Sequence, residues 1–372
     1  MNLKYSLIPL CLFACLQLNA QECADKQVSP ETKALFKNLH RLSGKKILFG
    51  HQDDPAYGVG WKYEDGRSDI RDVTGEFPAV YGFDLGRIEL GQDHNLDAVP
   101  FIKTKQYIQE AYARGGIITL SWHLNNPLTG GTAWDNKPGA VASILPGGEK
   151  NTLYIGWLDH VADFLGELKG KKGENIPLVL RLFHELNGGW FWWGKDQCSP
   201  EEMKKLWQFT IHYLRNKKKI HHLLYAYNTD RFNSIPDYLE RYPGDEWIDI
   251  LGFDIYQANN IKENEAFTVF FKKDLDLLDS IAVMHHKIPA LTEFGYNEIS
   301  DNSWWTRVFL PAIENHQVVY ALAWRNAGAH DNGKSEFYVP YKGQGSAEDF
   351  RKMIQSGKIL FEKGLQAEKI YK

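Results

Sequence analysis

Short apolar runs alternate with longer amphipathic stretches along the chain. Eight of these runs are continuously apolar, which is typical of parallel strands that helices cover outside and that pack against one another inside. We predict strands at Lys45–Gly50, Pro78–Leu85, Gly115–His123, Ile176–Glu185, His222–Asn228, Trp247–Tyr256, Ile288–Gly295 and Val318–Arg325. Strands separated by helices imply right-handed crossovers, and eight of them can close into a barrel. The predicted fold class is therefore α/β, a single (β/α)₈ TIM barrel.

The amphipathic stretches between these runs predict helices. We place them at Val99–Arg114, Asn151–Leu168, Pro200–Arg215, Ala266–His285, Trp304–Glu314 and Ala347–Lys363. The clearest start is Ser199-Pro200-Glu201-Glu202, which combines a capping residue, a first-turn proline and two acids near the positive end of the helix dipole. No linker divides the 372 residues, so we expect one catalytic domain over 21–372.

The first twenty residues have the features of an export signal. Lys4 precedes an apolar stretch from Leu7 to Leu16, and the segment ends in small residues at Ala20. We expect residues 1–20 to be removed and the protein to be periplasmic or secreted. We do not expect lipid attachment at Cys15, because Phe13 is bulky where such sites carry a small or β-branched residue. No later run is long enough to span a membrane.

Charge and cysteine content narrow the choice of partners. The formal net charge of −4 disfavours nucleic acid and anionic membranes and is compatible with a neutral ligand. After removal of the signal only Cys23 and Cys198 remain, and a disulfide between them is permitted but not required. The His and Cys spacings match no metal site. We expect no metal, no cofactor and a monomeric protein.

Polar and aromatic residues gather where the predicted strands end. They are His51, Asp84, His123, Glu185, Asn228, Tyr256, Glu293 and Trp324. The carboxyl ends of all strands of a (β/α)₈ barrel meet on one face, and that face holds the active site. The aromatic share of the chain is 13%, which favours a surface on which flat apolar faces stack.

Two glutamates at these ends suggest a reaction. Glu185 precedes Trp190-Phe191-Trp192-Trp193, and Glu293 precedes Phe294-Gly295. Apolar surroundings raise a carboxyl pKa, so Glu185 suits a general acid/base, and Glu293 suits the nucleophile. Such a pair is typical of glycoside hydrolysis, in which carboxyls roughly 5 Å apart retain the anomeric configuration and a gap of about 6.5 Å or more inverts it.

Each of these residues also has a simpler interpretation. Glu185 could pair with Arg181 inside the barrel, which would lower its pKa instead. His123, Tyr256 and Trp324 could each be a packed core residue. Their shared position at strand ends favours a common site over these separate explanations.

The segment Arg181-Leu-Phe-His-Glu-Leu-Asn-Gly-Gly-Trp-Phe-Trp-Trp-Gly194 resembles the acid/base signature of glycoside hydrolase family 26, in which β-mannanases predominate. Further blocks resemble the family in the same order: Leu48-Phe-Gly-His-Gln52, Ser121-Trp-His-Leu-Asn-Asn-Pro127, Gly252-Phe-Asp-Ile-Tyr256, Thr292-Glu-Phe-Gly295 and Trp324-Arg325. One departure is Leu186, where methionine is usual in the family. The swap between two apolar residues of similar volume is mild.

The resemblance implies a retaining double displacement with Glu185 as acid/base and Glu293 as nucleophile. It also implies substrate contacts in the sugar subsite beside the scissile bond, with Tyr256 hydrogen-bonded to Glu293. The residues assigned to substrate binding are His123, His184, Trp190, Tyr256, Trp324, Arg325, Asn187 and Trp134.

The expected substrate is β-1,4-mannan, as galactomannan, glucomannan or manno-oligosaccharides. Mixed-linkage β-1,3-1,4-glucan and β-1,3-xylan remain alternatives within the family, and endo and mannobiose-releasing modes stay open. The length of 50–77, 86–99 and 326–341 suggests a wall that partly blocks one end of the cleft. Two other classes are disfavoured: a glycan-binding barrel without activity, because both carboxyls are present, and a metal-dependent hydrolase, because no ligand cluster stands at the strand ends.

Overall fold

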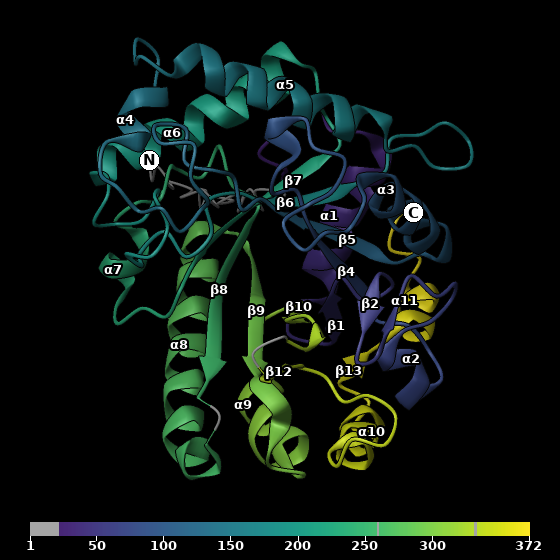
Figure 1. Ribbon diagram of the computed structural model, residues 1–372. Coiled ribbons are helices and arrows are strands. Elements are labelled where there is room, and N and C mark those ends of the chain that lie inside the picture. The colour runs from purple at the N-terminus through teal and green to yellow at the C-terminus, as the bar shows by residue number, and fades with distance from the viewer. Residues whose placement is uncertain (1–21, 259, 331–332) are drawn as a thin grey trace, which may run out of the picture.

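The computed structural model describes residues 22–258, 260–330 and 333–372. Its centre is a closed barrel of eight parallel strands in sequence order, in which the last strand pairs with the first (Figure 1). The barrel strands are β1 (Ile47–Gln52), β4 (Val80–Asp84), β5 (Ile117–Ser121), β6 (Leu178–Arg181), β7 (Leu223–Thr229), β8 (Ile250–Gln257), β9 (Ile288–Tyr296) and β10 (Tyr320–Ala323). Each lies within or overlaps one predicted run, so the predicted (β/α)₈ barrel is confirmed.

Helices surround this barrel (Figure 1). Four of the predicted helices are confirmed with small shifts of their ends: α3 (Phe101–Arg114), α5 (Asn151–Glu167), α6 (Pro200–His212) and α8 (Asn264–His285). The predicted start of α6 is a complete capping box, in which the Ser199 side chain accepts from the Glu202 N–H and the Glu202 side chain accepts from the Ser199 N–H. The remaining helices are α1 (Pro30–Leu42), α2 (Asp69–Thr74), α4 (Ala140–Ile144), α7 (Ile235–Leu239), α9 (Leu310–Ile313), α10 (Ala347–Gln355) and α11 (Glu362–Glu368).

Two predicted helices are interrupted. The helix expected at Trp304–Glu314 is a π-helical turn at Trp305–Phe309 followed by the short α9, which contains Pro311 and so lacks one backbone donor. The helix expected at Ala347–Lys363 ends at Gln355, because Gly357 adopts a left-handed φ of 72°. The chain then forms β13 (Ile359–Leu360), which pairs with β1, before α11 begins.

Alternate strand residues face two different cores. Leu48, Val179 and Leu322 point into the barrel, where they pack with the apolar face of α1. Phe49 and other neighbours of these residues point outward into the larger core beneath the surrounding helices. The N-terminal helix α1, which the apolar runs did not predict, belongs to the inner cluster and therefore leaves only the opposite end of the barrel free for a site.

The predictions for the export signal, the two remaining cysteines and membrane spans have different outcomes. The predicted signal, residues 1–20, and Cys15 lie outside the described residues. Cys23 is buried in the inner core cluster and Cys198 packs beside the outer core, and neither is in a disulfide. Among the helices of the described ranges, none has the length and apolar character needed to cross a membrane.

Two hairpins extend from the barrel. One joins β2 (Tyr57–Gly58) to β3 (Trp61–Lys62), and the other joins β11 (Gly328–Ala329) to β12 (Ser335–Glu336). Both leave the rim at the carboxyl ends of strands, the first after β1 and the second after β10. They fall within segments whose length predicted a wall beside the active site.

Phe49 tests the outward-facing core. Its ring stacks on Phe361 at 5.1 Å and meets Phe350 edge to face at 5.2 Å. We predict that Phe49→Ala lowers the free energy of unfolding by about 3–5 kcal/mol in urea titrations, because the ring leaves a cavity. Phe270→Ala, at a ring that is 45% exposed, is the control and should cost far less. Equal losses in the two variants would contradict this account of the core.

Candidate active site

Glu185 lies just past β6, in a segment with unusual backbone geometry. Phe183 and Glu185 both adopt left-handed φ values, 44° and 52°, although neither is glycine. Such strained backbone persists only where the surroundings fix it. Here Trp193 donates from Nε1 to the His184 carbonyl at 2.9 Å and packs in the core. The strain turns the half-buried Glu185 side chain out of the strand and toward the rim.

The four aromatic residues that follow Glu185 differ in burial: three are buried and one is exposed. Phe191, Trp192 and Trp193 are buried, and Trp192 is held by a 3.0 Å bond to the Leu124 carbonyl. Only Trp190 is exposed, at 39%, and its Nε1 donates to Glu185 Oε2 at 2.7 Å. The expected stacking surface therefore consists of one ring from this run, and the other three rings hold it in place.

Glu293 lies within β9 and is bound from two sides. The Tyr256 hydroxyl donates to Glu293 Oε2 at 2.6 Å, so the hydrogen bond expected between these two residues is present. Burial and the charge of Glu293 raise the pKa of Tyr256 well above its ordinary value, which keeps this donor protonated. The Arg181 guanidinium donates to Glu293 Oε1. These two donors fix the orientation of the Glu293 carboxylate.

The two glutamates face each other across the rim. They are separated by 108 positions in the chain, yet oxygens of Glu185, Asp254 and Glu293 lie within 4.8 Å of one another. The strand order β6-β7-β8-β9 brings them together, since Glu293 aligns with Asp254 in the β8–β9 register. This spacing matches the short separation that retention requires.

Arg181 does not pair with Glu185. Its guanidinium donates to Glu293 and to Asp254 Oδ2 (3.2 Å), so the alternative pairing considered from the sequence is wrong. Burial opposes the charge of Arg181, but Glu293 and Asp254 outweigh burial and raise its pKa. Burial and the charge of Glu293 in turn raise the pKa of Asp254 well above its ordinary value.

Glu185 is poised as an acid. Burial is the main cause that raises its pKa to about 8, and the nearby charges of Glu293 and Asp230 act in the same direction. The hydrogen bond from Trp190 and the charge of Arg181 oppose the shift without cancelling it. Glu185 therefore carries a proton at neutral pH, as a general acid must.

Three predicted binding residues, His123, Trp134 and His184, lie in contact with one another. His123 lies at the end of β5, and its imidazole stacks on the half-exposed Trp134 with centroids 5.2 Å apart and planes at 16°. His184 is buried beneath them, with Nε2 3.0 Å from His123 Nε2. Of these three residues Trp134 is the one open to solvent, because His123 and His184 are both buried.

The other predicted residues take different places. Trp324 and Tyr256 are partly exposed on the same rim. Asn187 accepts from the Asp230 N–H at 2.7 Å and donates to the Arg231 carbonyl at 2.9 Å, so its amide braces the next loop. Arg325 is bound by two carboxylates from other loops.

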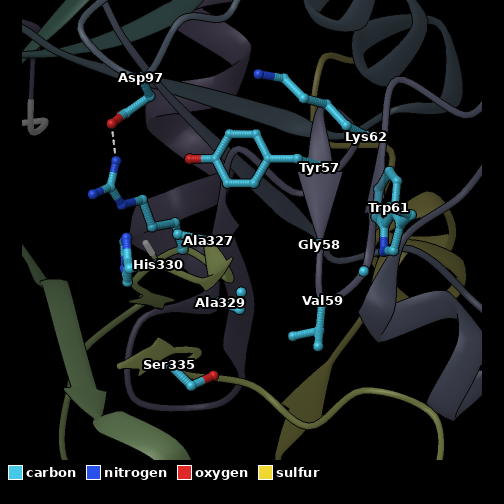
Figure 2. Close-up of a pocket in the computed structure, with 13 residues that line it drawn as sticks. Tyr57, Gly58, Val59, Trp61, Lys62, Asp97, Ala327, Ala329, His330 and Ser335 are labelled. Carbon is cyan, nitrogen blue, oxygen red and sulfur yellow. Dashed lines mark hydrogen bonds and ion pairs between the residues drawn. The ribbon is translucent and has the colours of Figure 1, made fainter. Parts of the chain in front are cut away.

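A cavity of about 770 Å³ opens beside Arg325 (Figure 2). Its walls are the β2–β3 hairpin, with Tyr57 and Trp61, and the β11–β12 segment, with His330 and Ser335. Arg325 donates to Asp97, the ion pair that Figure 2 marks with a dashed line, and to Glu336 Oε1 at 3.0 Å. The three segments predicted to form a wall thus meet at one guanidinium.

Some site residues were not assigned from the sequence. Asp254 stands in the Phe253-Asp-Ile-Tyr256 block, and its position two residues before Tyr256 on one strand was the available signal. Asp84 was noted only as a strand-end residue. In the described ranges, Glu185, Asp254 and Glu293 form the one group of His, Cys and acidic residues close enough together to hold a metal ion. Arg181 already brings positive charge to this group, so the absence of a metal remains our prediction.

Two carboxyls that face each other among exposed aromatic rings at the strand ends of a (β/α)₈ barrel define a glycoside hydrolase site. The chain belongs to glycosyl hydrolase family 26, whose model matches residues 24–297. The resemblance noted in the sequence is therefore confirmed.

Individual relatives agree with this assignment. A GH26 beta-mannanase structure from Bacteroides ovatus is 47% identical, with a TM-score of 0.88 over 92% of this chain and 98% of that one. A modular endo-beta-1,4-mannanase from Cellulomonas fimi is 33% identical, with a TM-score of 0.82 over 93% of this chain and 78% of that one. A mannan endo-1,4-beta-mannosidase of Bifidobacterium adolescentis is 34% identical over 92% of this chain, which spans about a third (36%) of that protein's length.

The raised pKa of Glu185 predicts how kcat/KM depends on pH. We expect kcat/KM to fall above about pH 8, because the acid must be protonated to act. Trp190→Phe removes a hydrogen bond that favours the ionised form, so the basic limb of the kcat/KM profile should move to higher pH while activity falls. A basic limb that moves to lower pH in Trp190→Phe would contradict the assignment of Glu185 as the acid.

Proposed function

We propose that this protein is a retaining β-mannanase that cleaves β-1,4 linkages in mannan, galactomannan or glucomannan and in manno-oligosaccharides. The observation that carries the proposal is the close approach of the Glu185 and Glu293 carboxyls, within 4.8 Å, on the rim of a family 26 barrel. Several relatives that cover most of this chain are named as mannanases, which supports mannan as the substrate.

The geometry supports a double displacement. In the first step Glu293 attacks the anomeric carbon, and Glu185 gives its proton to the leaving glycosidic oxygen. In the second step Glu185 takes a proton from water, the water oxygen attacks the anomeric carbon, and the bond to Glu293 breaks. Tyr256 and Arg181 hold Glu293 in place for both steps. Trp190, Trp134 and Trp324 offer ring faces on which sugars can stack.

The test is hydrolysis of mannan, mixed-linkage β-glucan and β-1,3-xylan by the mature protein. We expect mannan to be cleaved best, and Glu293→Ala to remove activity because no covalent intermediate can form. Glu185→Ala should lose mannan hydrolysis but keep the first step on an aryl mannoside, whose leaving group needs little protonation. Activity of Glu293→Ala equal to wild type would refute the mechanism, and preference for glucan or xylan would refute the substrate.

We also propose that one end of the cleft is partly blocked. The 770 Å³ cavity lies between two hairpins that converge on Arg325, and ion pairs to Asp97 and Glu336 hold this arrangement. Such a wall favours binding near a chain end and the release of short products such as mannobiose. The lengths of the segments that carry these two hairpins support the same proposal.

End-labelled manno-oligosaccharides test this blockage. We expect wild type to release mannobiose early. Glu336→Gln breaks an ion pair of the wall and keeps the size of the side chain. It should increase the share of longer products about two- to tenfold, since breaking a partly buried pair loosens the segments that it held. Products of random length from wild type would contradict the blockage.

Three further properties complete the proposal. The family match over residues 24–297 and a mannanase structure that aligns with 92% of this chain support one catalytic domain over 21–372, and we propose that it follows a removable segment. We propose that the protein is exported to the periplasm or medium and acts as a monomer. Mass spectrometry of the mature N-terminus would test the cleavage site after Ala20, and light scattering would test the monomeric state.

A further inference from the structure

Asp84 is a buried carboxylate at the end of β4 that the proposed mechanism does not use. Four donors surround it. Its Oδ2 accepts from the Ser121 hydroxyl at 2.6 Å and lies 2.7 Å from His123 Nδ1. Its Oδ1 accepts from the backbone N–H groups of Gly86, at 2.6 Å, and of His123, at 3.3 Å. The Ser121 hydroxyl and the two backbone N–H groups all donate to this carboxyl, which favours its ionised form.

The groups that donate to Asp84 determine which ring nitrogen of His123 carries the proton. Burial alone would raise the pKa of Asp84, but the charge of His123 and hydrogen bonds from His123, Ser121 and Gly86 together lower it to about 2. An ionised carboxylate can only accept. His123 therefore carries its proton on Nδ1, facing Asp84, and the Nε2 of neutral His123 is left as an acceptor.

The next link is His184. Its Nε2 lies 3.0 Å from His123 Nε2, so one proton must lie between the two rings. Burial, followed by the charges of Arg181 and His123, lowers the pKa of His184 well below its ordinary value, so this ring is neutral. When His123 is neutral as well, His184 is the donor, and the chain of hydrogen bonds runs from His184 through His123 to Asp84.

This chain ends beside the acid. His184 stands between Phe183 and Glu185, the two residues with left-handed φ, so fixing its ring helps to hold the strained backbone that aims Glu185. We propose that Asp84 is a positioning residue for the reaction: it orients His123, His123 orients His184, and His184 holds the backbone of Glu185. This inference rests on the proposed function, because it assigns Glu185 the role of acid.

Asp84→Asn tests the chain. The Gly86 N–H sits 2.6 Å from Oδ1 and cannot accept, so the new amide NH₂ must face His123 Nδ1. That forces the proton of neutral His123 onto Nε2, opposite the proton of His184, and one of the two rings must turn or change tautomer. The shape of the side chain is kept, while its negative charge is lost and the direction of its hydrogen bond to His123 reverses.

We expect Asp84→Asn to lower kcat/KM on manno-oligosaccharides by roughly 10- to 100-fold, the scale on which histidine-orienting partners act. On a dinitrophenyl mannobioside the loss should stay below about threefold, because this leaving group needs little protonation. Ser121→Ala, the matched control, removes another donor to the same oxygen but leaves the His123 contact. It should keep the wild-type ratio of the two rates.

Equal losses on both substrates would overturn the proposal, since they would show general damage instead of misplaced acid. Should Asp84→Asn fail to fold, nitrogen-15 NMR of the wild-type histidines decides: a protonated Nδ1 on His123 supports the chain, and a bare Nδ1 overturns it. Wild type that cleaves no mannan would refute the proposed function instead, and the NMR result stands apart from that outcome.

Discussion

The site depends on one buried cation. Arg181 on β6 is almost fully enclosed and binds Asp254 on β8 and Glu293 on β9, so it connects three strands inside the rim. Oxygens of three carboxyl groups lie within 4.8 Å of one another here, and the charge of Arg181 opposes the burial and the repulsion that raise the pKa of Glu185 and of Asp254. A buried charge is costly unless paired, and here Arg181 is paired with two acidic side chains, Asp254 and Glu293.

The two glutamates can take different roles because their surroundings differ. Glu293 has two donors, Tyr256 and Arg181, and is held as an oriented carboxylate. Glu185 has one, Trp190, and its burial opposes its ionisation. Environments that treat two carboxyls differently are how one site obtains both an acid and a nucleophile. Phe183 and Glu185, on either side of His184, adopt left-handed φ values, while Arg181 donates to Glu293.

Much of the fold and of the candidate site was predictable from local sequence patterns. The eight barrel strands and both glutamates were found because strand ends of a parallel barrel share one face and each run is readable by itself. The ion-pair partner of Arg181 was not predicted. Glu185 is four residues away in the sequence and Glu293 is 112, but the closed barrel brings Glu293 nearer to Arg181. Helix α1 was missed because its apolar face matters only once a barrel exists for it to close. The break at Gly357 needed the left-handed conformation that sequence alone does not fix.

Buried hydrogen bonds connect the loops that extend from the barrel. Asp69 accepts from the Val59 N–H at 2.9 Å, from Trp61 Nε1 at 2.7 Å and from Asn326 Nδ2 at 2.8 Å, and so ties the β2–β3 hairpin to the segment after β10. Asn326 in turn accepts from the Tyr338 N–H at 2.8 Å. Buried polar groups that are all satisfied give a rigid arrangement, because any displacement leaves one of them unpaired. The β2–β3 hairpin and the segment after β10 are therefore held to each other by side chains whose displacement would leave a buried polar group unpaired.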